Sequence, residues 1–122
     1  MGSILKEKGF SYAVRIVRLH QYLTEEKHEF TLSKQLLRSG TSVGAMIREA
    51  QNAESTADFI HKMAISQKEC DESSFWLELL KETDYLTERE FESIYKETQS
   101  LLKMIRSAII TSKKKMTKSN NS

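Results

Sequence analysis

The chain contains no proline and only four glycines in 122 residues, and this scarcity of helix breakers constrains its fold more than any other feature. Proline removes a backbone donor and glycine adds backbone freedom, so both interrupt helices. A turn-rich β-sandwich or barrel, a collagen, or a Pro/Gly-rich disordered chain would contain many more of them. The sequence therefore predicts an all-α protein, and its length predicts one domain.

A helix is predicted over residues 88–111. Thr87 and Glu90 have the spacing of a capping box, in which each side chain bonds the other residue's backbone amide, and Leu86 and Phe91 occupy the positions of a hydrophobic staple. The stripe that follows spans an arc of about 140° at 100° per residue, which predicts one buried face. Its members are Phe91, Ile94, Tyr95, Thr98, Leu101, Leu102, Ile105, Ala108 and Ile109.

Another helix is predicted over residues 56–82, where Ser55 and Asp58 form a shorter capping-box pattern. Its buried stripe is expected to contain Phe59, Met63, Cys70, Ser74 and Leu77, with Ile60, Ala64 and Phe75 at its sides. A second stripe on a different side, apolar and glutamate-rich, indicates a further contact surface. Its members are Ile65, Glu69, Glu72 and Trp76.

A third helix is predicted over residues 32–52, with Thr31 or Ser33 as its N-cap. The apolar centre line of this helix is Leu36, Gly40, Val43, Ile47 and Ala50. Glycine in a helix interior costs about 1 kcal/mol relative to alanine. We interpret Gly40 and Gly44, one turn apart, as positions of close helix packing. The alternative is a break between two short helices at residues 39–41.

The first helix, over about residues 4–25, is apolar around most of its circumference. Only a narrow arc with Ser11, Arg15 and Arg18 is polar. Such a helix is buried on two sides, and in a chain this small we expect the second side to contact another subunit. Because the loops are short, residues 1–111 are predicted to form one antiparallel up-down-up-down four-helix bundle that is oligomeric.

Residues 112–122 are predicted to form a basic disordered tail. Its four lysines and lack of acidic residues are typical either of a frayed, solvated terminus or of a nucleic-acid contact. Cations in the N-terminal half offer further phosphate ligands. The candidate nucleic-acid-binding residues are therefore Arg15, Arg18, Lys34, Arg38, Lys113, Lys114 and Lys115.

No catalytic or nucleotide-binding motif is recognisable. The single cysteine, Cys70, excludes an internal disulfide and a cysteine-rich zinc site. Two pairs, Glu25/His28 and Asp58/His61, have the acid-x-x-His spacing of di-iron bundles, but both lie at predicted helix ends, which favours surface histidines. We therefore expect no enzymatic activity, no metal and no cofactor. Lacking a signal sequence and an 18-residue apolar stretch, the chain is expected to be cytoplasmic and to bind no membrane.

Arginines and carboxylates of the two middle helices form a candidate subunit interface. Arginine binds a carboxylate through two parallel hydrogen bonds, so it suits an ion pair across a subunit contact. The alternative is a set of solvated charges, worth about 0–1 kcal/mol per pair. The expected interface contains Arg38, Arg48, Glu49, Ile65, Glu69, Glu72 and Trp76.

Residues 33–45 (SKQLLRSGTSVGA), with Ile47, Glu49 and Ala50 after them, resemble the signature of the 23S rRNA-intervening-sequence proteins. The resemblance extends from about residue 10 to residue 80, and Met46 stands where the family usually has asparagine. It implies a homo-oligomeric four-helix bundle, with a five-fold ring (a pentamer) known in the family, and no established enzymatic activity. A related accessory protein of diversity-generating retroelements forms such a ring and engages nucleic acid and a reverse transcriptase.

The leading hypothesis is thus a non-enzymatic, oligomeric accessory protein that binds RNA or DNA. The alternative is a protein-interaction scaffold whose acidic half binds a basic partner protein without contacting nucleic acid. That acidic half contains Glu78, Glu82, Glu88, Glu90, Glu92 and Glu97. A metal-dependent enzyme using the two histidine pairs is disfavoured.

Overall fold

The computed structural model describes residues 2–120, which form four helices and, within that range, no strand. The helices are α1 (Gly2–Glu25), α2 (Leu32–Gln51), α3 (Thr56–Glu82) and α4 (Glu88–Asn120). Residues 1, 121 and 122, which the domain and tail predictions included, lie outside the described residues. The all-α prediction is confirmed. None of these helices combines the length and the apolar character that crossing a membrane requires.

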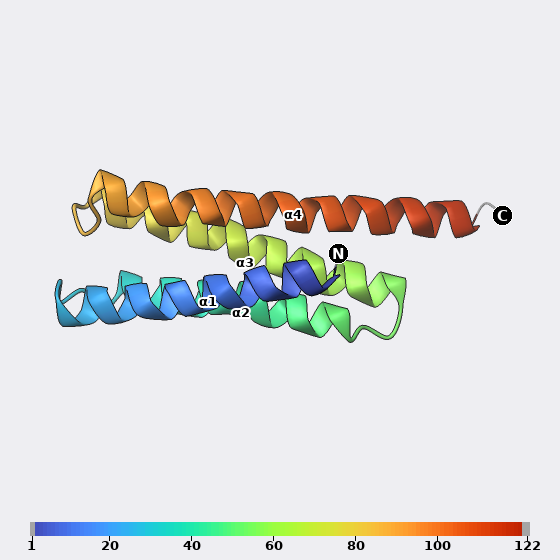
Figure 1. Ribbon diagram of the computed structural model, residues 1–122, viewed down its shortest axis with the longest axis horizontal. Helices are drawn as coiled ribbons and strands as arrows, with labels where there is room; N and C mark the ends of the chain where they lie inside the picture. Colours follow the sequence, from blue (N-terminus) through green and yellow to red (C-terminus); the bar gives the residue numbers. More distant parts are fainter. Residues whose placement is uncertain (1, 121–122) are drawn as a thin grey trace.

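Successive helices are joined at alternate ends of the molecule (Figure 1). α1 packs on α2, α2 on α3 and α3 on α4, and a smaller contact joins α1 to α4. Over the described residues the backbones of α1 and α3 are not adjacent, and these two helices meet only through side chains in the core. They therefore lie diagonally, and their outer faces point to opposite sides of the molecule. α4 is the longest helix and projects past the other three at one end (Figure 1).

Both predicted capping boxes begin helices. The Thr87 amide donates to Glu90 Oε1 at 2.8 Å, and the Glu90 amide donates to Thr87 Oγ1 at 3.2 Å. At α3 the Asp58 amide donates to Ser55 Oγ at 3.0 Å, but the Asp58 carboxylate accepts the amide of Glu54 rather than that of Ser55. The hydrogen bonds that cap α3 and α4 thus come from residues beside each helix start, as the sequence pattern indicates.

The start of α2 differs from the prediction, because neither Thr31 nor Ser33 caps it through its side chain. Instead the carboxylate of Glu29 accepts the amides of Thr31, Leu32 and Ser33 at 3.2, 2.8 and 2.7 Å. Three otherwise unpaired amides of the first turn are thereby satisfied by one anion. The Ser33 hydroxyl donates back to the carbonyl of Glu29 at 2.8 Å, and Glu29 is buried.

The predicted tail also differs from the structure, because α4 does not end at residue 111 but continues to Asn120. Residues 112–120 contain neither glycine nor proline, so nothing in them breaks the helix. Lysines near the C-terminal end of a helix interact favourably with its dipole. Lys113, Lys114 and Lys115 are consequently held on a helix rather than on a disordered segment.

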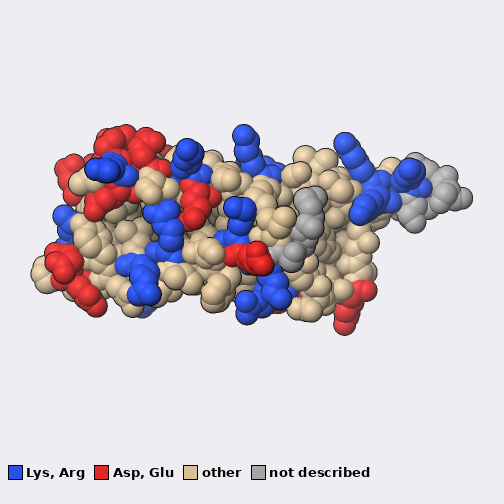
Figure 2. Space-filling view, in the orientation of Figure 1, with Lys and Arg blue, Asp and Glu red and all other residues tan. Residues whose placement is uncertain are grey.

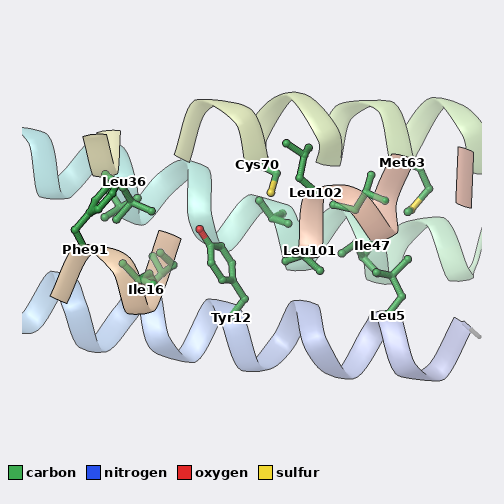
Figure 3. Packing of buried hydrophobic residues seen from close by; sticks show 14 of the residues in the cluster. Leu5, Tyr12, Ile16, Leu36, Ile47, Met63, Cys70, Phe91, Leu101 and Leu102 are labelled. Atoms are coloured by element: carbon green, nitrogen blue, oxygen red, sulfur yellow. The ribbon is translucent and has the colours of Figure 1, made fainter. Parts of the chain in front are cut away.

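Side chains from all four helices meet in one core (Figure 3). α2 is one continuous helix through residues 39–41, so the alternative of a break there is wrong. Its predicted centre line, including Gly40, is buried. The α4 stripe is buried apart from Tyr95 and Ala108, which are half-buried. On α3, Phe75 was expected beside the core but is 56% exposed. Its position lies about 160° around the helix from buried Leu77, which turns it toward solvent.

Glycine allows α1 and α2 to approach until their backbones touch. A Cβ on Gly44 would lie 2.6 Å from the carbonyl oxygen of Gly9, and a Cβ on Gly40 would lie 2.7 Å from Ile16 Cγ1. Gly9 is the partner that the sequence pattern did not reveal. Its own Cβ would lie 3.2 Å from the Cα of Gly44. The cost of glycine in both helices is therefore offset by close packing.

Small hydroxyl side chains allow a similar approach between α2 and α3. Ser39 Oγ and Ser73 Oγ are 2.9 Å apart, and Ser66 Oγ donates to the carbonyl of Val43 at 2.9 Å. All three serines are fully buried. Since each hydroxyl has a partner, burial leaves no unpaired donor between the two helices.

We expect Gly44→Ala to destabilise the protein by about 1–3 kcal/mol, because the new Cβ meets a backbone oxygen that cannot move independently. Exposed Ala45, the next residue, supplies the control. Ala45→Gly measures helix propensity alone and should cost about 0.5–1 kcal/mol. Chemical denaturation gives both values. A Gly44→Ala protein more stable than the wild type would contradict the backbone contact with Gly9.

Candidate functional site

Charge is distributed unevenly along the chain. Residues 98–122 contain six lysines and arginines and no acidic residue, whereas residues 1–97 contain 13 lysines and arginines and 17 acidic residues. Figure 2 shows the consequence on one face of the molecule: acidic side chains gather at the end where α3 joins α4, and basic side chains gather on the projecting end of α4. The distal half of α4 is thus the most cationic element of the protein.

Most of these cations share one side of α4. At 100° per residue they fall in an arc of about 140°, and over about 33 Å of helix length they face solvent. The members of this basic face are Lys96, Lys103, Arg106, Lys113, Lys114 and Lys118, all of them exposed. Lys115 lies on another side and lines a hollow next to Leu5. A straight row of exposed cations is suited to contacting several phosphates of a polyanion.

The structure does not bring the predicted N-terminal phosphate ligands together. Arg15 and Arg18 line a hollow between α1 and α4, and Arg15 donates to Ser93 Oγ at 2.9 Å and lies 3.5 Å from Glu97 Oε2. Arg38 lies on α2 and points to α3, with exposed Lys34 one turn before it. Within one chain these four residues therefore do not form a continuous basic surface, and their role as phosphate ligands stays a prediction.

Arg38 is instead the centre of an ion-pair cluster within one chain. Its guanidinium donates to Glu69 Oε2 at 2.9 Å and to Glu72 Oε2. Trp76 Nε1 also donates to Glu72 Oε2, at 2.9 Å. The hydrogen bond from Trp76 lowers the pKa of the Glu72 carboxyl, and Arg38 lowers it further. The carboxylate in turn raises the pKa of Arg38. Four of the predicted interface residues, Arg38, Glu69, Glu72 and Trp76, are thus joined in one cluster.

The other predicted interface residues lie apart from this cluster. The Arg48 guanidinium is 5.6 Å from the ring centroid of Phe10, and Glu49 pairs with Lys62 at 3.5 Å. Ile65 is half-buried on α3. The predicted interface residues therefore form two groups: Arg38 with the α3 residues around Trp76, and Arg48 with Glu49 near the C-terminal end of α2. Exposed Phe75 extends the first group, with its ring 5.0 Å from that of Trp76.

The outer side of α1 remains apolar and uncovered in the single chain. Phe10, Val14 and Val17 are 57%, 40% and 38% exposed, and they repeat at helical spacing on one face. Beside Phe10 the close contact of α1 and α2 leaves a hollow with small side chains such as Ala13 and Ala45. We name Phe10, Val14 and Val17 the apolar face of α1. An exposed apolar row of this kind is typical of a protein contact.

Polar groups in the core have structural partners. The hydroxyls of Tyr12 and Thr98 are 2.7 Å apart, and the Cys70 thiol donates to the carbonyl of Thr98 at 3.5 Å. Burial raises the pKa of the Cys70 thiol to about 12 and also raises that of Tyr12. A thiol in this environment is protonated at neutral pH and is a poor nucleophile. These groups consequently stabilise the core.

The histidine pairs are at the surface. His28 and His61 are exposed, and the carboxylate of Asp58 accepts the Glu54 amide at 3.2 Å as part of the α3 cap. His20 is half-buried, with Nδ1 3.3 Å from the carbonyl of Ser33. Within the part of the chain that the structure describes, no three His, Cys, Asp or Glu side chains are arranged to hold a metal ion.

Three cations of α4 were missed by the sequence analysis, namely Lys96, Lys103 and Arg106. They precede residue 112, where the basic tail was expected to begin. For Lys103 and Arg106 the missed signal was the absence of any Asp or Glu after Glu97. Together with the prediction that the helix ended early, this placed the boundary of the basic region about 14 residues too late.

The chain is similar to a described protein family and to solved structures. The sequence profile of the family described as 23S rRNA-intervening sequence protein matches residues 3–107. The chain is also similar to the crystal structure of a protein of unknown function from the S23 ribosomal protein family of Bacteroides thetaiotaomicron. That similarity has 48% sequence identity and a TM-score of 0.87, over 88% of this chain and 96% of that chain. No curated protein matches the sequence.

Trp76 is the only tryptophan, so its fluorescence can report the ionisation of Glu72. Because the folded-state pKa of Glu72 is lowered, the carboxylate keeps its contacts at neutral pH and loses them only as the pH falls through that pKa. We expect a fluorescence transition with a midpoint below about 4.3, the usual glutamate value. Arg38→Gln should raise this midpoint, whereas Arg48→Gln should not. Circular dichroism verifies that the protein stays folded, and a midpoint unaffected by Arg38→Gln would contradict the cluster.

Proposed function

Because the chain belongs to the 23S rRNA-intervening sequence protein family, we propose that it is a non-enzymatic, homo-oligomeric protein that binds RNA through the basic face of α4. The single observation that carries this proposal is the absence of acidic residues after Glu97, where six cations follow. Cations that neutralise phosphates release the counterions of the nucleic acid, and this release drives binding at low salt.

Self-association follows from the apolar face of α1. In this proposal that face packs against the α3 surface around Trp76 and Phe75 of a second copy. The two surfaces lie on diagonal helices and are not the same patch, so the contact is heterologous and forms a ring if the rotation closes. The subunit is an antiparallel four-helix bundle. A ring would repeat the basic face of α4 in each subunit, which compensates for the excess of acidic residues before residue 98.

The gathering of acidic side chains where α3 joins α4 favours a second candidate function (Figure 2). Exposed Glu78, Glu82 and Glu88 lie in this region, and such a patch attracts a basic protein segment. In this alternative the protein is a scaffold that contacts no nucleic acid. A partner that is captured equally well before and after nuclease treatment, by a protein that fails to bind RNA, would favour it.

We expect the triple variant Lys103→Gln/Arg106→Gln/Lys114→Gln to weaken binding to a structured RNA by about tenfold or more at low salt. It should also reduce the salt dependence of the association constant, because each lost phosphate contact on a duplex lowers the slope by about 0.9. Filter binding across a salt series measures both quantities.

The matched control is Lys8→Gln/Lys27→Gln/Lys68→Gln, which removes three exposed cations that do not belong to the basic face of α4. It should leave the salt slope close to that of the wild type. RNA retention that is independent of salt, or that falls equally in both triple variants, would contradict a role for the basic face.

We expect Phe10→Asp to dissociate the oligomer, because it places a charge in the apolar face of α1. Phe30, which is 60% exposed in the loop after α1, supplies a control of equal chemistry, and Phe30→Asp should leave the assembly intact. Light scattering coupled to size exclusion measures the mass. The double variant Glu69→Ala/Glu72→Ala should weaken assembly as well. A wild-type protein with the mass of one chain would contradict self-association.

A further inference from the structure

A hollow of about 480 Å³ lies between α1 and the first turns of α4. Its apolar lining comes from Leu19 and from the buried side chain of Ile94, with Tyr22 beside them. Three arginines line it as well, Arg15 and Arg18 from α1 and Arg89 from α4. An apolar hollow with a few polar groups is the usual form of a small-ligand site, and three guanidinium groups select an anion.

The charges of these arginines are neutralised to different extents. The Arg15 guanidinium donates a hydrogen bond to Ser93 and forms an ion pair with Glu97. Arg18 and Arg89 are exposed, and neither forms an ion pair with any carboxylate of the described residues. Glu90 also lines the hollow; its carboxylate accepts the Thr87 amide at 2.8 Å in the α4 cap and remains one negative charge beside the two free guanidinium groups. Two guanidinium groups thus remain available to a ligand.

Ser93 adds a donor. Its hydroxyl oxygen accepts a hydrogen bond from Arg15 Nη2, so its own proton is available to a second acceptor. An anion in the hollow can therefore accept hydrogen bonds from Arg18, Arg89 and Ser93. A phosphate monoester carries about −1.5 to −2 charges and three strong acceptor oxygens, which match this set of donors better than a phosphodiester does.

The hollow is also aligned with the basic face of α4. Arg89, Lys96 and Lys103 follow one another at intervals of seven residues, or about two helical turns, and so lie on one side of the helix. Resting on the proposed RNA binding, we infer that this hollow holds the terminal phosphate monoester of an RNA whose backbone continues along the basic face of α4. The site would then distinguish an RNA end from internal phosphodiesters.

The experiment compares one short RNA duplex with 5′-phosphate, 3′-phosphate or hydroxyl ends, using fluorescence anisotropy and the full-length protein. We expect one of the phosphate ends to strengthen binding roughly tenfold. The variant Arg18→Gln/Arg89→Gln should abolish this preference. Arg106→Gln, on the basic face but outside the hollow, should weaken all three RNAs equally and keep the preference.

Equal affinity of the wild type for the three RNAs would overturn the inference and leave RNA binding intact. If no RNA binds, the proposed function fails, and the hollow is then tested with adenosine 5′-monophosphate against adenosine. NMR chemical-shift changes of the Arg18 and Arg89 side chains that the monophosphate causes and adenosine does not would support a phosphate monoester site. Their absence would overturn it.

Discussion

The backbone contact between Gly9 and Gly44 is the constraint on which the other surfaces depend. It fixes how α1 lies on α2, and thereby which residues of a largely apolar helix turn inward. Tyr12, Ile16 and Leu23 are fully buried as a result, whereas the apolar face of α1 points away from the core. A larger residue at position 44 would separate the helices. The same contact creates the hollow beside Phe10.

The sequence predicted the helices well because their signals are local. Capping residues and the apolar period of α2 and α4 belong to the same segment as the helix that they specify. Glu29 was missed because a carboxylate that caps from the preceding loop has no short motif. Gly9 was missed because its partner is 35 residues away. Of the candidate site, the sequence predicted single charges but not their neighbours: only the fold places Arg15 against α4 and Arg38 against α3.

Opposite charges are sorted to the two ends of α4. The acidic end is anchored to α3 by Tyr95, which donates to Glu78 at 3.0 Å, and by Lys81, which pairs with Glu88 at 3.0 Å. The basic end projects past the other helices, where no carboxylate of α4 competes for its lysines. Apolar surfaces on α1 and α3 and a cationic row on α4 thus occupy separate sides, so one can be engaged without covering the others.

The buried thiol of Cys70 can report local opening of the bundle. The thiol is fully buried between α3 and α4, and it is the sole cysteine of the chain. An alkylating reagent added to the native protein therefore reaches sulfur only in molecules whose α3–α4 packing has opened. When reclosing is faster than alkylation, the labelling rate is proportional to the fraction of molecules that are open. Any ligand or neighbouring subunit that stabilises the closed bundle will lower the alkylation rate of Cys70 by the same factor by which it lowers the population of open molecules.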